Sequence, residues 1–484
     1  MRRKTVVTPL PDGGDEVSAA GESTDTPPQP SPPFRKLFLL TLVFLYVPFA
    51  YTYGVKLHSI TFVDLSSFYY AAQTTFVRHQ SPYTLGALAW GVTATHDPVW
   101  PYLYPPPTLL LFSPFAHMSY GHAKLLMLAA NHFCVLGLLF LLLRVLGLTG
   151  SLRPQASLGQ EQGGDGLYKK LTALFLAVYL FLFQPIVQTL IAGQINLYVI
   201  VLLCLMWYAL KKNAAPALSA IPFTLAIILK TYPLLFLPIL LLKGRWQVVS
   251  WTLGFMALLI AASYVVLPHA LWHDWFTLVL PYGGYTKTPP GLFSPSSVWN
   301  QSVNAFASRL FLDPQTALLV SPGAARITAY SFCAAFFGAE VFLTWRLRGV
   351  QKAVRRQTPE GTRNVGPVDN DRFLDLEFAL FLLTMYLVAP LSWEHHLVFV
   401  LPALFLALAR VFSRQESRWM TLWIAVPAFI IAWPIHLENA PWEGHFFHLF
   451  LSLKFYAVVA LWLFFSTRLA QILRDAKKES LLPT

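Results

Sequence analysis

Long apolar segments separated by short polar ones run along most of this chain. A helix of about 17–25 apolar residues crosses the roughly 30 Å hydrocarbon core of a bilayer. Segments of this kind recur from Leu37 to Phe465, so the pattern predicts an all-α polytopic membrane protein. The expected spans cover residues 37–53, 122–146, 171–190, 195–210, 248–267, 325–345, 374–391, 397–412, 419–435 and 447–466.

The apolar segment 214–242 departs from this pattern, because polar residues interrupt its middle. At about 1.5 Å per residue it is longer than one span requires. Basic residues flank both of its ends, at positions 211, 212, 243 and 245. Tyr232 precedes Pro233, and helical conformation is disfavoured before proline. We therefore predict a hairpin of two short helices with Lys230 at its tip, which makes about twelve membrane helices in total.

Composition supports a membrane protein, and charge gives it an orientation. The chain is 56% hydrophobic and 12% charged, whereas soluble domains are about one quarter charged. Its net charge of +12 would suggest a nucleic-acid partner in a soluble protein. Here most Lys and Arg residues lie in the tails and in alternate short loops, which the positive-inside rule assigns to the cytoplasm. We predict a cell (inner) membrane protein with both termini cytoplasmic and no nucleic-acid partner.

Three regions follow from these patterns. Residues 1–36 are rich in Pro, Gly, Ser and Thr and predict a disordered cytoplasmic tail. The membrane domain occupies 37–466, and 467–484 form a second cytoplasmic tail. The first apolar run begins too late, and lacks the cleavage site, for a signal peptide. The cysteines lie within apolar runs and form no CxxC pair, which gives no sign of a disulfide framework or zinc site; they are residues 134, 204 and 333.

Two loops on the predicted outer side are long, 54–121 and 268–324. Both mix Trp, Tyr and Phe with polar residues. Segments of that composition form amphipathic helices at a membrane surface, and we expect such helices in both loops. The alternative is an aromatic belt at the level of the lipid headgroups, with no role in a site.

Asp64 is the first residue of chemical interest. It lies just beyond the first predicted span, where acidic residues on the outer side are few. A carboxylate at that place can act as a general base on a hydroxyl nucleophile. Its position also suits a helix N-cap, which is an ordinary structural role for aspartate.

Amide side chains gather at turns on the same predicted side. Each amide offers two donors and an acceptor, which suits sugar hydroxyl groups. Capping and turn formation are equally open to them. The residues are Gln194 and Asn196 between two spans, and Asn300 and Gln301 in the second long loop; Tyr104 lies in a Tyr-Pro-Pro-Pro segment of the first.

Lys230 is an ionisable residue inside an apolar stretch, a costly position that usually implies a partner or a task. It suits a lipid phosphate, and the alternative is snorkelling of the side chain to the surface. Glu394, His395 and His396 begin another span on the same side. Adjacent histidines lack the i, i+4 spacing of a helical metal site, so contact with a phosphate or sugar, or packing at the interface, is expected.

Together these motifs resemble the polyprenol-phosphate-mannose-dependent mannosyltransferases, glycosyltransferase family 87 of the GT-C fold. The resemblance extends in order from about residue 37 to 412. It is carried by Asp64 with Tyr69-Tyr70-Ala71-Ala72, Ser81-Pro82-Tyr83, Tyr104-Pro105-Pro106, Gly193-Gln194-Ile195-Asn196, Lys230-Thr231-Tyr232-Pro233, Asn300-Gln301-Ser302 and Ser392-Trp393-Glu394-His395-His396.

The resemblance implies an inverting transfer of mannose or a related hexose from a polyprenyl-phosphate donor to a glycan or glycolipid at the outer face of the bilayer. Asp64 would be the base, and Lys230, His395 and His396 would bind the donor phosphate. The implied substrate-binding residues are Tyr69, Tyr104, Gln194, Asn196, Asn300, Gln301 and Glu394. Asp64 is followed by Leu65 and Ser66 and lacks the paired acidic motif that can hold a metal in many GT-C enzymes, so we expect neither metal nor cofactor.

Two rival functions share these general features. A transporter or flippase would also have about twelve helices, but such proteins commonly carry internal repeats and a polar path at mid-membrane. No clear repeat is present, and the polar residues gather at one face. A ligase for lipid-linked polymers would differ mainly in its acceptor. The absence of a Gly-rich nucleotide-binding motif after a strand favours a lipid-linked sugar donor over a nucleotide sugar.

Overall fold

The computed structural model describes residues 34–54, 62–148, 163–313, 316, 318–357, 373–434 and 445–478. Regular structure in these ranges is helical, with isolated bridges only. The helices are α1 (Phe34–Gly54), α2 (Val63–Phe76), α3 (Leu85–Thr95), α4 (Pro106–Phe112), η2 (Ser113–His117), α5 (Tyr120–Val145), α6 (Gly163–Leu182), α7 (Gln184–Ala192), α8 (Asn196–Lys211), α9 (Pro216–Leu229), η4 (Tyr232–Leu235), α10 (Phe236–Leu242), α11 (Trp246–Val266), α12 (Ala270–Asp274), η5 (Trp275–Val279), η6 (Leu280–Tyr282), α13 (Val303–Leu310), α14 (Pro322–Gln357), α15 (Leu374–Val388), η9 (Glu394–Val400), α16 (Leu401–Phe412), α17 (Arg418–Ala432), α18 (His445–Phe450) and α19 (Leu453–Lys478).

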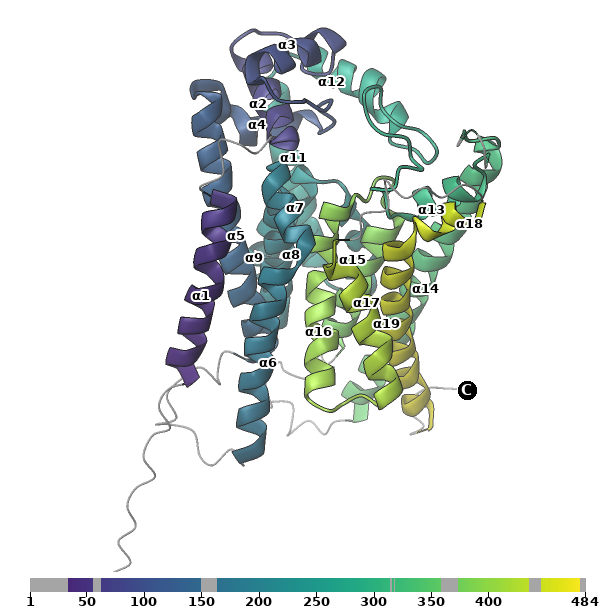
Figure 1. Cartoon of the computed structure of the whole chain (residues 1–484). Helices are drawn as coiled ribbons and strands as arrows, with labels where there is room; N and C mark the ends of the chain where they lie inside the picture. Colours follow the sequence, from purple (N-terminus) through teal and green to yellow (C-terminus); the bar gives the residue numbers. More distant parts are fainter. Residues whose placement is uncertain are drawn as a thin grey trace, which may run out of the picture.

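The long helices stand side by side (Figure 1). Helices α1 and α5 lie at one side, α14 to α19 at the other, and α6 to α9 between them. The short helices α2, α3 and α12 lie at one end of this bundle, which we call the upper end; the opposite end is the lower end. The first long loop therefore folds into helices above the spans.

Six helices are long and apolar enough to cross a membrane: α1, α5, α11, α14, η9 with α16, and α19. Helices α6 and α7 qualify together but are bent by 42°, so the described part of the chain has up to seven candidate spans. The protein is thus an all-α polytopic membrane protein. The predicted count of twelve is not reached, because α8, α9, α10 and α17 are shorter than a full span.

The segment 214–242 folds back on itself, as its flanking charges predicted. Helix α9 ends at Leu229, and Lys230 takes an extended backbone conformation that breaks the helix. The chain then returns through η4 and α10. Both terminal nitrogens of the Arg245 guanidinium lie 3.2 Å from the side-chain oxygen of Asn213, so the two ends of the segment meet. The hairpin prediction is confirmed.

Ion pairs join several helices at the lower end. The Nζ atom of Lys211 lies 2.6 Å from a carboxylate oxygen of Asp375, and Lys243 pairs with Glu377. Both acids occupy the first turn of α15, and Lys211 occupies the last turn of α8. Each charge therefore complements the dipole of its own helix. Lys211 also donates to the carbonyl of Val145, so the loops predicted on one side of the membrane do meet at one end.

Helices form in both long loops, as predicted, but α2 is buried on nearly every side. Its hydroxyl groups bind the extended segment that follows α3. The Ser66 hydroxyl donates to the carbonyl of Pro98 at 3.0 Å, and Ser67 donates to that of Trp100 at 2.7 Å. This burial removes α2 from the membrane surface and makes it part of the protein interior.

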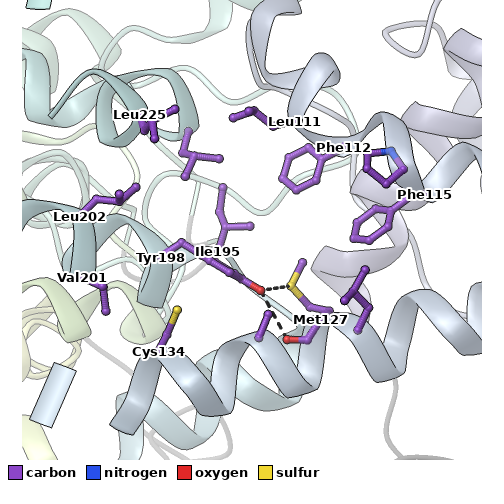
Figure 2. Close-up of a pocket in the computed structure, with 14 residues that line it drawn as sticks. Leu111, Phe112, Phe115, Met127, Cys134, Ile195, Tyr198, Val201, Leu202 and Leu225 are labelled. Atoms are coloured by element: carbon purple, nitrogen blue, oxygen red, sulfur yellow. Dashed lines mark hydrogen bonds between the residues drawn. The ribbon is translucent and has the colours of Figure 1, made fainter. Parts of the chain in front are cut away.

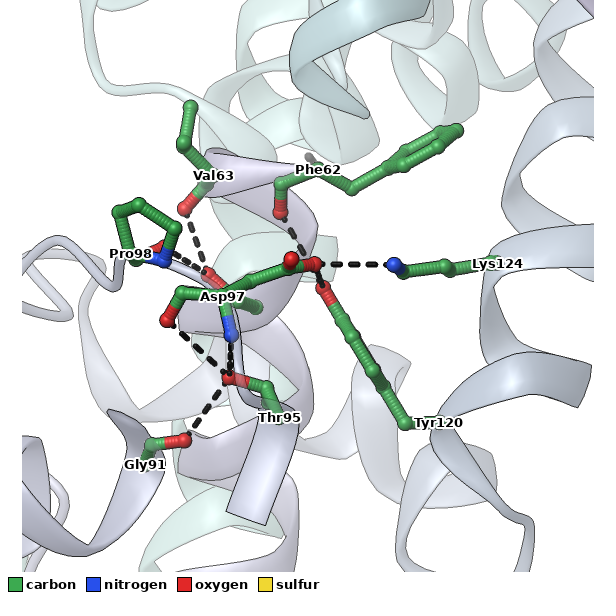
Figure 3. Close-up of polar contacts among 9 residues, drawn as sticks. Phe62, Val63, Gly91, Thr95, Asp97, Pro98, Tyr120 and Lys124 are labelled. Carbon is green, nitrogen blue, oxygen red and sulfur yellow. Dashed lines mark hydrogen bonds and ion pairs between the residues drawn. The ribbon is translucent and has the colours of Figure 1, made fainter. Parts of the chain in front are cut away.

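The start of α2 is also fastened to α5, as Figure 3 shows. A carboxylate oxygen of Asp97 lies 2.9 Å from the Lys124 ammonium and accepts a hydrogen bond from the Tyr120 hydroxyl at 2.8 Å. Tyr120 also contacts the carbonyl of Phe62, at 3.4 Å. Phe62 immediately precedes α2, so this cluster fixes the backbone that enters the helix.

The predicted tails are only partly described. Residues 1–33 of the predicted N-terminal tail lie outside the described residues, and α1 begins at Phe34. Helix α19 continues to Lys478, beyond the predicted end of the membrane domain at 466. Residues 479–484 lie outside the described ranges. The domain limits remain predictions.

Candidate active site

Asp64 is the second residue of α2, and its side chain is half-buried. The N-cap of α2 is Phe62, and no side chain caps this end, so the capping role does not apply. Burial raises the pKa of the Asp64 carboxyl to about 6; the charge of Lys230 and a hydrogen bond with Gln194 act in the opposite direction. At neutral pH the group is mostly ionised, yet more basic than an ordinary aspartate.

Gly193 permits the close approach of two segments that are far apart in the sequence. It ends α7 with a φ of +67°, a conformation that glycine adopts without strain. A Cβ atom at this position would lie 2.7 Å from the Phe62 ring and 2.8 Å from the Cβ of Leu65. Only a residue without a side chain therefore lets Gln194 approach Asp64.

Gln194 links Asp64 to Tyr104. Its side-chain oxygen accepts from the backbone N–H of Ile195 at 2.8 Å, which orients the amide. The same side chain hydrogen-bonds both the Asp64 carboxyl and the Tyr104 hydroxyl. Burial, and then the charge of Asp64, raise the pKa of Tyr104, so this phenol stays neutral. These three predicted site residues therefore form one polar cluster.

Lys230 completes this cluster. Its side chain is buried, with 7% of the residue exposed, which excludes the snorkelling alternative. Its Nζ lies 2.7 Å from the Nε2 of His396, and the Tyr232 and Phe399 rings lie within 6 Å. Burial lowers the pKa of the ammonium to about 7, and the negative charge of Asp64 opposes that shift. Near neutral pH this group can therefore bind an anion as a cation, or release its proton.

The segment with both predicted histidines is held against α7 and α8. The carbonyl of His395 accepts from Asn196 at 3.3 Å and from the Thr189 hydroxyl at 3.2 Å. The side-chain nitrogen of Asn196 therefore binds the protein itself. Its side-chain oxygen is buried and has no hydrogen-bond partner among the described residues. The Nε2 of His395 is likewise buried and unpartnered. Within the described residues, these two atoms therefore have no hydrogen-bond partner from the protein.

Glu394 lies in a separate ionic contact. Its carboxylate oxygen is 3.1 Å from the ammonium of Lys454 on α19 and accepts from Gln188 on α7 at 3.1 Å. Both side chains are almost fully buried, with 2% of Lys454 and 7% of Glu394 exposed. Sequence reasoning missed Gln188 and Lys454. A basic residue inside the predicted span 447–466 was the available signal.

Asn300 and Gln301 bind the protein itself. The Asn300 amide donates to the carbonyls of Pro295 and Pro390, and its oxygen accepts from the backbone N–H groups of Ser302 and Ser392. Gln301 likewise donates to two carbonyls and accepts from one backbone N–H. The Asn300 amide thus ties the second long loop to the segment before η9, and the Gln301 amide ties it to the start of α19.

Tyr69 also has a partner in the scaffold. Its hydroxyl donates to the carbonyl of Met118 at 3.1 Å, and its ring packs on that of Tyr120. The structure therefore brings together Asp64, Tyr104, Gln194, Lys230 and the two histidines; Asn196 joins them through the His395 carbonyl. It directs the polar groups of Tyr69, Asn300, Gln301 and Glu394 toward other parts of the protein. In the described residues no group of three or more His, Cys, Asp or Glu is arranged for a metal ion.

Figure 2 shows an apolar cavity of about 420 Å³. Side chains from α4, η2, α5, α8 and α9 line it, together with Ile195. Ile195 follows Gln194 in the chain, and Leu229, another lining residue, precedes Lys230. The polar cluster and the cavity thus share two backbone segments. Cys134 of α5 also lines the cavity and carries a free thiol.

The model of the family described as glycosyltransferase family 87 matches residues 102–362, more than half of the chain. The matched region contains Tyr104, Gln194 and Lys230, whereas Asp64 and residues 394–396 lie outside it. No curated protein and no solved structure matches the chain.

Proposed function

Because this chain belongs to glycosyltransferase family 87 and is a multi-pass membrane glycosyltransferase, we propose that it moves mannose or a related hexose from a polyprenyl-phosphate donor to a glycan or glycolipid acceptor. The transfer proceeds with inversion on a GT-C fold. The observation that carries this proposal is the cluster of Asp64, Gln194 and Lys230, which shares backbone segments with an apolar cavity. Sugar transfer from a lipid-phosphate donor requires a base for the acceptor hydroxyl, a cation for the phosphate and a site for the hydrocarbon chain.

Asp64 is the general base. An inverting transfer needs an acceptor hydroxyl that loses its proton as its oxygen attacks the anomeric carbon. The raised pKa of the carboxyl, about 6, strengthens it as a base while leaving it mostly ionised at neutral pH. Gln194 orients the carboxylate through their hydrogen bond.

Lys230 meets the donor phosphate. A phosphate that leaves the sugar gains negative charge on its bridging oxygen, and a buried cation stabilises that charge more than an exposed one does. The Nε2 of His395 is an unpartnered polar atom of the same cluster, and it contacts the phosphate or the sugar. The Nε2 of His396 lies 2.7 Å from the Lys230 Nζ and positions the ammonium.

The apolar cavity takes the first isoprene units of the donor. Its walls are apolar side chains, and it begins one residue away from Lys230, at Leu229. A lipid with its phosphate at Lys230 would place its hydrocarbon chain there. Burial of apolar chain contributes about 25 cal/mol per Å² of surface.

The upper end faces away from the cytoplasm. The loops rich in Lys and Arg meet at the lower end, where Lys211 and Lys243 form ion pairs. By the positive-inside rule that end is cytoplasmic. Both termini then lie in the cytoplasm, and transfer takes place on the periplasmic or extracellular side.

Replacing Asp64 by asparagine tests this function. The amide keeps the size of the side chain but cannot accept the proton, so we expect transfer to fall by about 10²–10⁴-fold. Purified protein would be given radiolabelled polyprenyl-phosphomannose and a total glycolipid extract as acceptor. The matched control is Asp274→Asn, which changes a carboxylate of α12 and should leave the rate unchanged. An Asp64→Asn protein that is folded and retains most of the wild-type rate would remove Asp64 from the mechanism.

A further inference from the structure

Lys230 has an unusual set of neighbours for a buried cation. Its close contact is the Nε2 of His396, a ring nitrogen, at 2.7 Å. A carboxylate, that of Asp64, acts on it electrostatically. The titratable groups that face it from each packed element are Asp64 of α2, Tyr232 of η4, and His395 and His396 of η9.

His396 can serve Lys230 in either charge state. Its Nδ1 accepts from the backbone N–H of Trp393 at 3.2 Å, and the Leu391 backbone also hydrogen-bonds the ring. When Nδ1 carries the proton, Nε2 can accept from the Lys230 ammonium. When Nδ1 accepts from Trp393, Nε2 carries the proton and donates to a neutral Lys230 amine.

A buried lysine normally cannot lose its proton without leaving a polar atom unpaired, which costs free energy. The surroundings of His396 remove that obstacle, because each charge state of Lys230 has a matching tautomer of the ring. From this geometry we propose that Lys230 is the proton donor to the departing lipid phosphate, with His396 as its positioning residue. The proposal rests on the proposed function and deepens it.

The proton balance closes within the site. The acceptor hydroxyl gives its proton to the Asp64 carboxylate while its oxygen forms a bond to the anomeric carbon. The bond from that carbon to the phosphate oxygen breaks, and its electron pair goes to the oxygen. Lys230 gives one N–H proton to this phosphate. Asp64 then returns its proton to the Lys230 amine, so the proton of the acceptor leaves on the lipid phosphate.

The two groups are matched for the return step. Burial brings the pKa of Asp64 up to about 6 and that of Lys230 down to about 7, so a proton passes from the acid to the amine in the favourable direction. No proton has to cross to bulk water within the cycle.

Lys230→Arg separates proton donation from charge. Arginine keeps a cation but holds its proton at every working pH. We expect Lys230→Arg to retain a donor KM within a few-fold of the wild-type value, while kcat falls by about 10²-fold or more. Lys230→Met should both raise the donor KM and lower kcat. An arginine variant that keeps most of the wild-type kcat would overturn proton donation and leave Lys230 as a phosphate-binding group.

The pH profile gives a second readout that a misfitting arginine does not affect. Wild-type kcat/KM should fall below about pH 6, where Asp64 becomes protonated, and above about pH 7, where Lys230 loses its proton. The fall at high pH should disappear from the residual activity of Lys230→Met. It should move to lower pH in His396→Phe, because the ammonium loses its acceptor.

A high-pH fall that persists unchanged in Lys230→Met would refute the proposal. The proposed function fails in a different way: wild-type protein would then transfer no label from polyprenyl-phosphomannose to the glycolipid extract. The two failures are therefore distinguishable in the same assay.

Discussion

Lysines at the lower end of this protein and Lys230 toward the upper end are held in different ways. At the lower end, Lys211 and Lys243 each contact a carboxylate directly, and the acids lie in the first turn of α15. Toward the upper end, Lys230 contacts a ring nitrogen instead, and Asp64 is held by an amide. The lysines of the lower end thus have direct carboxylate partners, whereas Lys230 and Asp64 are not joined by a direct ion pair. A direct ion pair stabilises the fold, whereas an incompletely matched pair leaves groups for chemistry.

Replacing each lysine by methionine is the strongest test of that contrast. Lys243→Met breaks a buried ion pair by removing its cation, which should lower the free energy of unfolding by about 3–5 kcal/mol. Lys230→Met removes a cation that burial already disfavours, so its stability should stay near the wild-type value although transfer is lost. Unfolding of both purified proteins in a denaturing detergent, followed by tryptophan fluorescence, measures the difference. Equal destabilisation by the two substitutions would abolish the distinction between the ends.

Most features of the lower end could be predicted from the sequence. Clusters of Lys and Arg between apolar runs identified which loops meet there, and the flanking charges of 214–242 predicted the hairpin. The number of spans could not be predicted, because several apolar runs form helices of only 7–16 residues that pack against neighbouring helices. Hydropathy gives the apolar length of a segment, but tertiary packing decides where its helix ends.

The upper cluster was predictable only in part. Residue type singled out Asp64, Gln194 and Lys230, but nothing local to these positions says that they meet. Asn300 shows the opposite difficulty, because an amide suited to sugar can equally be consumed by backbone groups. Which occurs depends on loops that fold together from distant parts of the chain.

Two glycines in left-handed turns allow a smaller and sharper comparison. Gly193 and Gly244 have φ values of +67° and +74°. An alanine costs about 1–2 kcal/mol in that conformation at either site. At Gly193 its Cβ would also meet Phe62 and Leu65 below 3 Å, whereas at Gly244 it meets the end of the flexible Arg348 side chain at 3.3 Å.

We therefore expect both alanine variants to lose stability, and only Gly193→Ala to lose transfer, by about tenfold or more, because α2 and Asp64 move away from Gln194. A misplacement of about 1 Å can cost 10²-fold in rate. Melting temperature and transfer rate, measured on the same preparations, check both parts. If Gly244→Ala reduces transfer as much as Gly193→Ala, the loss reflects general destabilisation and not the position of Asp64.

The smallest expected effect concerns the cavity, which has a thiol in its wall. If the donor lipid occupies the cavity, polyprenyl phosphate should slow the reaction of Cys134 with a small apolar thiol reagent. At ten times its Kd the lipid leaves about one tenth of the sites free, so labelling should slow by about tenfold.

Cys333 provides the internal control, since its sulfur lies 3.0 Å from the Tyr285 hydroxyl, away from the cavity lining, and its reaction rate should not change. Mass spectrometry of the two labelled peptides gives both rates in one sample. Equal protection of Cys134 and Cys333 would mean a general effect of the lipid on the protein. Protection of neither cysteine would show that the donor lipid does not bind in the cavity. The polar cluster would then lack a binding site for the hydrocarbon chain of the donor.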